Sequence, residues 1–331
     1  MPARRRKASR PGEFALIDRY FRPLAADPGA FSLKDDAALV IQPPGDELVM
    51  TADMVVADVH FVADDAPASI ARKALRVNLS DLAAKGATPV GYLMALALPD
   101  GWREAWIKAF AAALAEDQAS FGVTLLGGDT TRSSGGTSIA ITAIGRLPKG
   151  TMVLRSGARP GDAIFVSGTI GDAALGLRIR KQGKAAGRGA RFLLDRYLHP
   201  QPRVALAPIL REHATSAIDV SDGLVGDLAH ICDVSGVGAE IGSHAVPLSP
   251  AAAGMLRDDR ALLPTILNGG DDYEILATVP VADAAAFSHE AEAAGVPVTR
   301  IGEIVRGKGP PVVKDATGKP IRLTKASHTH F

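Results

Sequence analysis

The chain has 331 residues, and its 37 Lys and Arg against 36 Asp and Glu leave a formal net charge of +1. This balance gives no general affinity for nucleic acid or for an anionic membrane, and no run of about 18 apolar residues predicts a transmembrane helix. The single cysteine, Cys232, excludes a disulfide framework and a cysteine-based zinc site. At roughly 150 residues per domain, the length predicts two domains.

Helical and strand patterns alternate through the first half of the chain. Apolar side chains at helical spacing predict helices, and short apolar runs between turn residues predict strands. In chain order, the sequence predicts a helix at 13–22, strands at 37–41 and 48–52, a helix at 67–85, a strand at 90–98, a helix at 102–121, and strands at 123–126 and 138–145.

The pattern restarts after Pro148, Lys149 and Gly150, which places a domain boundary near 147–155. Beyond it, the sequence predicts strands at 163–167, 217–220, 274–279 and 299–305, and helices at 203–211, 224–234 and 282–294. Mixed helices and strands in both halves indicate an α/β or layered α+β fold. The predicted domains are 12–148 and 149–331.

The first ten residues are basic and are followed by no apolar segment. A secretory signal is therefore not expected, and we interpret 1–11 as a disordered basic tail of a cytoplasmic protein. A nucleic-acid-binding arm and an organelle transit peptide are the alternatives for this segment.

The acidic residues are unevenly divided into 26 Asp and 10 Glu. Glu is the better helix former, so an excess of Asp indicates turns, caps or metal sites. Nine aspartates lie at predicted junctions between elements, often beside glycine: Asp35, Asp36, Asp53, Asp81, Asp129, Asp219, Asp222, Asp271 and Asp272. Carboxylates at neighbouring strand ends can converge on one pocket, although each of them singly is also typical of a turn or a helix cap.

Converging carboxylates repel each other unless cations neutralise them, and hard oxygen ligands suit Mg²⁺, which commonly bridges to phosphates. The cluster therefore predicts a magnesium–phosphate site with several ions. The chain contains no Walker A motif. Phosphate would instead be held by metal, by Arg155 or by main-chain N–H groups, for which Gly168–Gly171 before a predicted helix is a candidate. An ordinary linker charge is the alternative for Arg155.

An ordered set of sequence motifs makes the prediction of a magnesium–phosphate site more specific. It comprises Gly12-Glu13-Phe14, Lys34-Asp35-Asp36-Ala37-Ala38, Thr51-Ala52-Asp53, His60-Phe61, Val77-Asn78-Leu79-Ser80-Asp81-Leu82-Ala83-Ala84, Gly127-Gly128-Asp129-Thr130-Thr131-Arg132, Arg155-Ser156-Gly157, Asp219-Val220-Ser221-Asp222-Gly223-Leu224 and Gly269-Gly270-Asp271-Asp272-Tyr273-Glu274. From Gly12 to His330, the chain resembles the thiamine-monophosphate kinases of the aminoimidazole ribonucleotide synthetase-like superfamily.

The resemblance implies a two-domain synthetase-like fold with an N-terminal dimerising domain and a C-terminal α/β domain. It implies direct, in-line transfer of the γ-phosphoryl of ATP to thiamine monophosphate, the last step of thiamine diphosphate biosynthesis, in a homodimer that needs several Mg²⁺ ions. The implied metal site consists of Asp35, Thr51, Ala52, Asp53, Asp81, Asp129, Asp219 and Asp222. The implied ATP contacts are Gly128, Asp129, Arg155 and Ser221, and the implied contacts to thiamine monophosphate are His60, Asp271 and His328.

No general acid or base is nominated, because the acceptor phosphate is already ionised at neutral pH. Four positions depart from the family pattern: Lys34, Ala52, Asp271 and His328. Lys34 and Ala52 motivate a different hypothesis, a non-catalytic sensor of nucleotide or thiamine phosphate on the same fold. Another ATP-dependent synthetase of the superfamily is the remaining alternative, but selenophosphate synthetase needs a cysteine near its N-terminus and the only one here is Cys232.

Overall fold

The computed structural model describes residues 11–183 and 186–323. Residues 1–10 of the predicted basic tail lie outside the described residues, and so does His328. No helix within these ranges is long and apolar enough to cross a membrane. By its internal contacts the chain divides into two compact units. The first contains the residues up to Ile41, Ala52–Leu75 and Val90–Ala143, and the second contains Gln42–Thr51, Arg76–Pro89 and the residues from Ile144 on.

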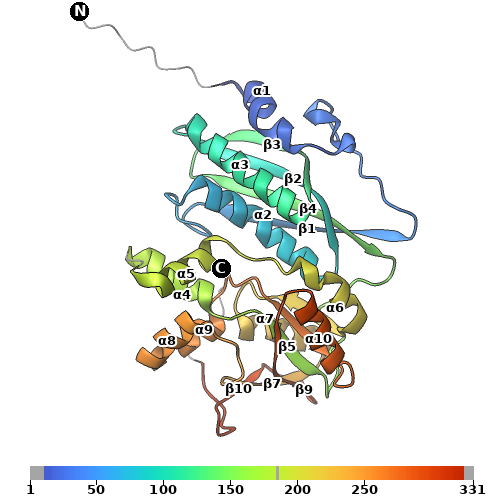
Figure 1. Cartoon of the computed structure of the whole chain (residues 1–331), viewed down its shortest axis with the longest axis vertical. Helices are drawn as coiled ribbons and strands as arrows, with labels where there is room; N and C mark the ends of the chain where they lie inside the picture. The colour runs from blue at the N-terminus through green and yellow to red at the C-terminus, as the bar shows by residue number, and fades with distance from the viewer. Residues whose placement is uncertain (1–10, 184–185, 324–331) are drawn as a thin grey trace, which may run out of the picture. The chain divides into compact units, whose positions relative to one another are not determined.

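The first sheet has four strands in the order β1-β4-β2-β3 (Figure 1). Their bounds are β1 Asp46–Val56, β2 Thr88–Pro99, β3 Thr124–Ser133 and β4 Ser138–Pro148. Helices α2 (Pro67–Ala84) and α3 (Glu104–Phe121) lie against one face of this sheet. Along β2, Met94 and Leu96 are buried while Leu93 and Ala95 are exposed. This alternation is the pattern of a strand with one covered face.

The second sheet has six strands in the order β10-β7-β9-β5-β8-β6. The strands are β5 Ala163–Ser167, β6 Ser216–Asp219, β7 Gly238–Gly242, β8 Ile275–Val279, β9 Val298–Val305 and β10 Val312–Lys314. Central β5 pairs antiparallel with both β8 and β9. At the edge, β6 pairs antiparallel with β8, so that Asp219 at the end of β6 lies opposite Ile275 at the start of β8.

Helices cover both faces of this second sheet. They are α4 Asp172–Gln182, α5 Gly187–Leu198, α6 Ala207–His213, α7 Leu224–Ser235, α8 Pro250–Asp258, α9 Leu263–Asn268 and α10 Ala284–Ala293. Alternate residues of β5 enter different cores: Ile164 and Val166 pack in one apolar cluster, and Ala163 and Phe165 in another. Because successive strand residues point to opposite faces, β5 is apolar at nearly every position.

Two predicted elements near the N-terminus differ in the structure. The helix predicted at 13–22 consists of a short α-helix, α1 (Glu13–Leu16), a π-helical turn at Ile17–Phe21 and a 3₁₀ turn at Arg22–Leu24. The strand predicted at 37–41 is wrong, because no ladder partner pairs with it among the described residues. Instead, Leu39 N donates to Gly29 O at 2.8 Å, a bond to a neighbouring turn.

Candidate active site

The side chains of Thr51 and Asp81 meet within the second unit. Thr51 in β1 donates its hydroxyl to Oδ2 of Asp81, in the last turn of α2, at 2.6 Å. Burial raises the pKa of Asp81, while the hydrogen bond from Thr51 and the positive charges of Arg155 and Lys85 oppose that rise. The predicted metal ligands Thr51 and Asp81 therefore interact with each other, and the charge of the predicted ATP contact Arg155 acts on Asp81.

Lys85 belongs to the same group, although no sequence motif pointed to it. Its Nζ donates to the main-chain oxygen of Ala217 at 2.7 Å. Burial and the positive charge of Arg155 lower the pKa of Lys85 to about 8, against the opposing negative charges of Asp219 and Asp81. Residues four apart on a helix share a face, so the Asp81–Lys85 spacing was the signal that could have found it.

The loop from Asp219 to Gly223 is held by a buried carboxylate. The main-chain N–H groups of Ser221, Asp222 and Gly223 each donate to Oδ2 of Asp227 at 3.1 Å. Burial and the neighbouring charge of Asp222 raise the pKa of Asp227 to about 7. Asp227 thus occupies the N-terminus of α7 and fixes the loop that carries a predicted ATP contact and a predicted metal ligand.

A second loop, residues 269–273, pairs with the first. Asp271 N donates to Ser221 O at 2.9 Å, and Tyr273 N donates to Val220 O at 2.8 Å. The approach is so close that a Cβ at Gly270 would lie 2.2 Å from Ser221 O. The structure therefore brings together the predicted substrate contact Asp271 and the predicted ATP contact Ser221.

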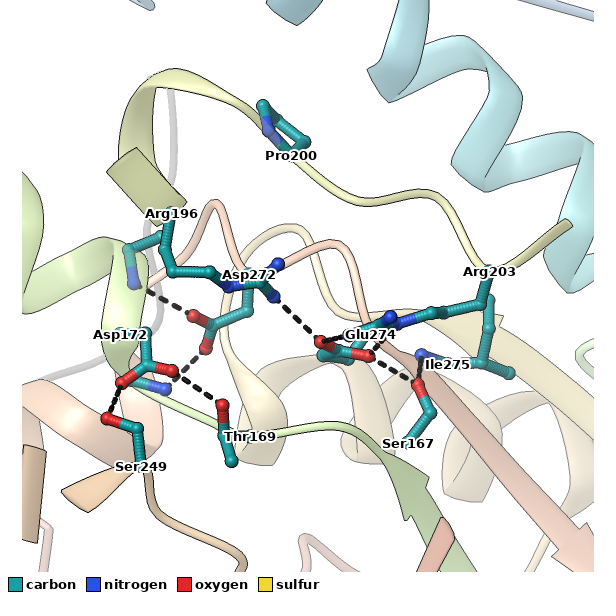
Figure 2. Close-up of polar contacts among 12 residues, drawn as sticks. Ser167, Thr169, Asp172, Arg196, Pro200, Arg203, Ser249, Asp272, Glu274 and Ile275 are labelled. Carbon is teal, nitrogen blue, oxygen red and sulfur yellow. Dashed lines mark hydrogen bonds and ion pairs between the residues drawn. The ribbon is translucent and has the colours of Figure 1, made fainter. Parts of the chain in front are cut away.

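Two main-chain donors at the start of α4 are already bonded within the chain, contrary to the expectation that Gly168–Gly171 offers them to phosphate. Gly171 N donates to Oδ2 of Asp272 at 2.6 Å, and Ala173 N donates to Oδ1 of the same residue at 3.0 Å (Figure 2). Asp272 is 1% exposed. The chain's own carboxylate has taken the place that an anionic ligand would have at this helix N-terminus.

The remaining predicted residues lie in the first unit. Asp35 is in an exposed bend, where Oδ1 accepts the main-chain N–H of Asp36 at 2.8 Å. His60 closes a turn after β1: its Nδ1 accepts from Val56 N at 3.1 Å, and its main-chain oxygen accepts from Lys73 Nζ at 2.9 Å. The imidazole therefore has a fixed orientation, with Nε2 carrying the proton in the neutral form.

Asp53 and Asp129 lie within strands, not at strand ends as expected. Asp53 is in β1, next to the exposed Ala52, and Asp129 is in β3 opposite Ala95 of β2. Gly128 also lies within β3. Neighbouring β2 comes so close there that only glycine fits, because a Cβ would lie 1.9 Å from Met94 O. Both aspartates are exposed, so these strands present carboxylates along their length.

A further group of possible metal ligands contains none of the predicted site residues. The ligand atoms of Glu212, His213 and Glu290 are within 4.8 Å of one another in the described part of the chain. His213 Nε2 is 3.2 Å from Glu290 Oε2, so the pair forms an ion pair when the histidine is protonated. That interaction links the end of α6 to α10.

Comparison with known proteins shows which class of protein has this fold and these site residues. Residues 34–147 match the N-terminal domain of AIR synthase related proteins, and residues 159–315 match the C-terminal domain of the same proteins. Both domains occur in the chain in that order. The fold is therefore the two-domain synthetase-like fold that the sequence motifs predicted.

Individual relatives narrow the class further. Thiamine-monophosphate kinase of Caulobacter vibrioides is 46% identical over 306 residues, which cover 91% of this chain and 86% of that protein. The crystal structure of thiamine-monophosphate kinase from Stenotrophomonas maltophilia K279a is 41% identical, with a TM-score of 0.83 over 94% of this chain and 98% of that one. A structure of AaThiL complexed with AMPPCP and TMP is 29% identical, with a TM-score of 0.77 over 97% of each chain. The chain belongs to the thiamine-monophosphate kinase family.

Proposed function

We propose that the protein transfers the γ-phosphoryl group of ATP to the phosphate of thiamine monophosphate. The bond from Pγ to the β,γ-bridging oxygen breaks, a bond from Pγ to an acceptor phosphate oxygen forms, and the products are thiamine diphosphate and ADP. The observation that carries the proposal is the pairing of the 219–223 and 269–273 loops through Asp271 N and Ser221 O. It brings residues expected to bind substrate, nucleotide and metal into one place within a chain of this family.

The donor set fits Mg²⁺. The ligand atoms expected from the described residues are oxygens of carboxylates, one hydroxyl and the main chain, and Mg²⁺ prefers such hard ligands. The residues that would hold the ions are Asp35, Thr51, Ala52, Asp53, Asp81, Asp129, Asp219 and Asp222. Ala52 can contribute only its main chain. When bound, Mg²⁺ would offset the negative charge that two phosphorylated substrates bring together.

The chain's own residues would bind and orient the two substrates. Arg155 can form paired hydrogen bonds to phosphate, and Gly128 would contact the nucleotide through its main chain. His60 and Asp271 would orient thiamine monophosphate, a role that His328 would share. No side chain needs to remove a proton, because the acceptor oxygen is already ionised. Catalysis then consists of positioning and charge neutralisation.

We also propose a homodimer formed through the N-terminal domain, with domains at 12–148 and 149–331. Support comes from β1, where Leu48, Met50 and Met54 are 37%, 67% and 56% exposed. These positions, with the exposed Ala52 between Met50 and Met54, lie on one side of the strand, and exposed apolar side chains gathered on one face mark an interaction surface. We place the reaction in the cytoplasm, where ATP is available.

The experiment is a direct assay with purified protein, ATP, Mg²⁺ and thiamine monophosphate, in which thiamine diphosphate and ADP are separated and quantified. We expect the two products in a 1:1 ratio, and none when Mg²⁺ is replaced by a chelator. Asp219→Asn should lose most of the activity at unchanged folding. Tight binding of both substrates without turnover would favour the sensor, the alternative that Ala52 and Lys34 motivate.

A further inference from the structure

Two buried carboxylates, those of Asp272 and Glu274, follow the expected substrate contact Asp271 in the chain. Asp272 is 1% exposed and Glu274 is 0% exposed. Between and beside them, Asp271 and Tyr273 adopt left-handed conformations, with φ of 73° and 51°. Residues other than glycine disfavour that conformation. The loop therefore keeps its shape only if its surroundings hold it.

Asp272 holds the loop to the start of α4. Both of its carboxylate oxygens are used, because Oδ2 accepts from Gly171 N at 2.6 Å and Oδ1 from Ala173 N at 3.0 Å (Figure 2). The start of α4 is itself fixed by Asp172, which accepts from Thr169 Oγ1 and from Ser249 Oγ, each at 2.5 Å. Asp272 is thus bonded to a helix start that is itself held by hydrogen bonds to Asp172.

Glu274 holds the other end of the loop. Its Oε1 accepts from Arg196 Nη2 at 2.7 Å and from Arg203 Nη2 at 2.5 Å. Its Oε2 accepts from Arg203 Nε and from Ser167 Oγ, both at 2.6 Å. Ser167 Oγ in turn accepts from Ile275 N at 2.8 Å. Charge-assisted and bidentate bonds of this kind are strong and directional, so the loop is anchored to α5 and β5.

We propose that Asp272 and Glu274 are positioning residues for the thiamine phosphate: they hold Asp271 in its left-handed conformation and so set where its carboxylate meets the substrate. Both are buried and act through Asp271. The bond from Asp271 N to Ser221 O at 2.9 Å also aligns this loop with the nucleotide loop. The identity of the substrate rests on the proposed function.

The first test is Asp272→Asn. The amide supplies one acceptor oxygen, and its NH₂ group faces a main-chain N–H, so one of the two anchoring bonds is lost without a change of size. We expect the KM for thiamine monophosphate to rise about tenfold and the KM for ATP to change less than about twofold. The matched control is Asp195→Asn, which alters an exposed carboxylate of α5 that is bonded to His199 Nδ1 at 2.7 Å. It should leave both constants unchanged.

A double-mutant cycle with Asp271→Ala separates positioning from general loosening. If Asp272 acts through Asp271, Asp272→Asn should raise the KM for thiamine monophosphate far less in the Asp271→Ala background. An equal increase in both backgrounds, or an unchanged KM in folded Asp272→Asn, overturns the proposal.

Arg203→Lys is a milder second variant, should Asp272→Asn fail to fold. It keeps the positive charge and loses the fork that grips Glu274, and it should raise the KM for thiamine monophosphate more than that for ATP. Equal increases of the two constants contradict the proposal.

Wild-type turnover separates this inference from the proposed function. An active wild type with an unaffected Asp272→Asn variant contradicts only the inference. A wild type that binds thiamine monophosphate without turnover contradicts the kinase activity, and the same cycle is then measured as binding affinity by calorimetry. A wild type that binds no thiamine monophosphate contradicts both.

Discussion

The hydroxyl of Thr51 donates to Oδ2 of Asp81 at 2.6 Å, and this bond joins β1 to α2 at two expected metal ligands. The hydroxyl favours the charged carboxylate against the burial that raises the pKa of Asp81. A side chain that helps keep Asp81 ionised also keeps it ready to bind a cation.

Thr51→Val should therefore weaken the use of Mg²⁺. The substitution preserves the side-chain shape and removes the donor to Asp81. We expect the Mg²⁺ concentration for half-maximal rate to rise about tenfold, the loss of one hydrogen bond to a charged group. Initial rates across a Mg²⁺ titration measure this. Thr51→Ser retains the hydroxyl and should stay near wild type; similar behaviour of the two variants would contradict the role of the hydroxyl.

Asp227→Asn should preserve the binding of ATP, whereas Asp227→Ala should weaken it. A single oxygen, Oδ2, accepts all three main-chain N–H groups of the 221–223 loop, and Asn can place its one carbonyl oxygen there. Asp227→Ala leaves those donors unpaired. We expect it to raise the KM for ATP by about tenfold or more, with Asp227→Asn within about threefold of wild type by the same estimate. Steady-state kinetics at saturating thiamine monophosphate distinguish them, and equal loss in both variants would mean that the charge itself is required.

Lys85 should make stability depend on pH in the alkaline range. Its pKa is lowered from 10.5 to about 8 in the folded chain, so between these values the unfolded chain binds the proton that the folded chain has released. The free energy of unfolding contributed by this group is fully present above 10.5 and falls as the pH drops through about 8, by up to about 3 kcal/mol. Urea unfolding at pH 8 and pH 10 should show a rise for wild type relative to Lys85→Met. Parallel curves for the two proteins would contradict the lowered pKa.

Gly270→Ala should disturb the contact between the two site loops. The new Cβ would lie 2.2 Å from Ser221 O, and main-chain atoms cannot move aside as a flexible side chain can. We expect a loss of stability of roughly 2 kcal/mol or more together with a large loss of kcat/KM. Gly254→Ala is the matched control, because its nearest new contact is 3.8 Å away within α8. Thermal melting and kinetics on both variants give the comparison, and a fully active Gly270→Ala would show that the approach is not required.

Met50→Asp should dissociate the proposed homodimer. Met50 is 67% exposed on β1, and a charge in the centre of an apolar interface is expensive to bury. We expect light scattering to show a dimer for wild type and a monomer for the variant. Val281→Asp, which changes a side chain that is 55% exposed just after β8, should remain dimeric. A monomeric wild type would contradict the proposed assembly.

The sequence predicted best where local pattern decides the structure. The strand at 163–167 has the predicted bounds, because an apolar run between turn residues is unambiguous when both faces of the strand are buried. The run at 37–41 has the same local character but lacks a strand to pair with among the described residues. Helices α8 and α9 were not predicted. They have nine and six residues, too few for a clear periodic pattern.

Within the site, ordered motifs located the loops but not what holds them. Asp219, Ser221, Asp222 and Asp271 were identified by their setting among Gly and Asp residues. Arg196 and Arg203 lie 78 and 71 residues from Glu274 along the chain. No local pattern connects residues at such separations, so the network that anchors the loop is visible only in three dimensions.

Two helix N-termini in the second unit are already occupied by the chain's own acids, Asp272 at α4 and Asp227 at α7. An anion that arrives without cations therefore meets neither helix as a receptor. Because Asp272 and Asp227 already occupy these two helix N-termini, the protein would select metal-bound nucleotide over free phosphate, sulfate or uncomplexed ATP. Such a protein would respond to the magnesium level of its surroundings as well as to its substrates.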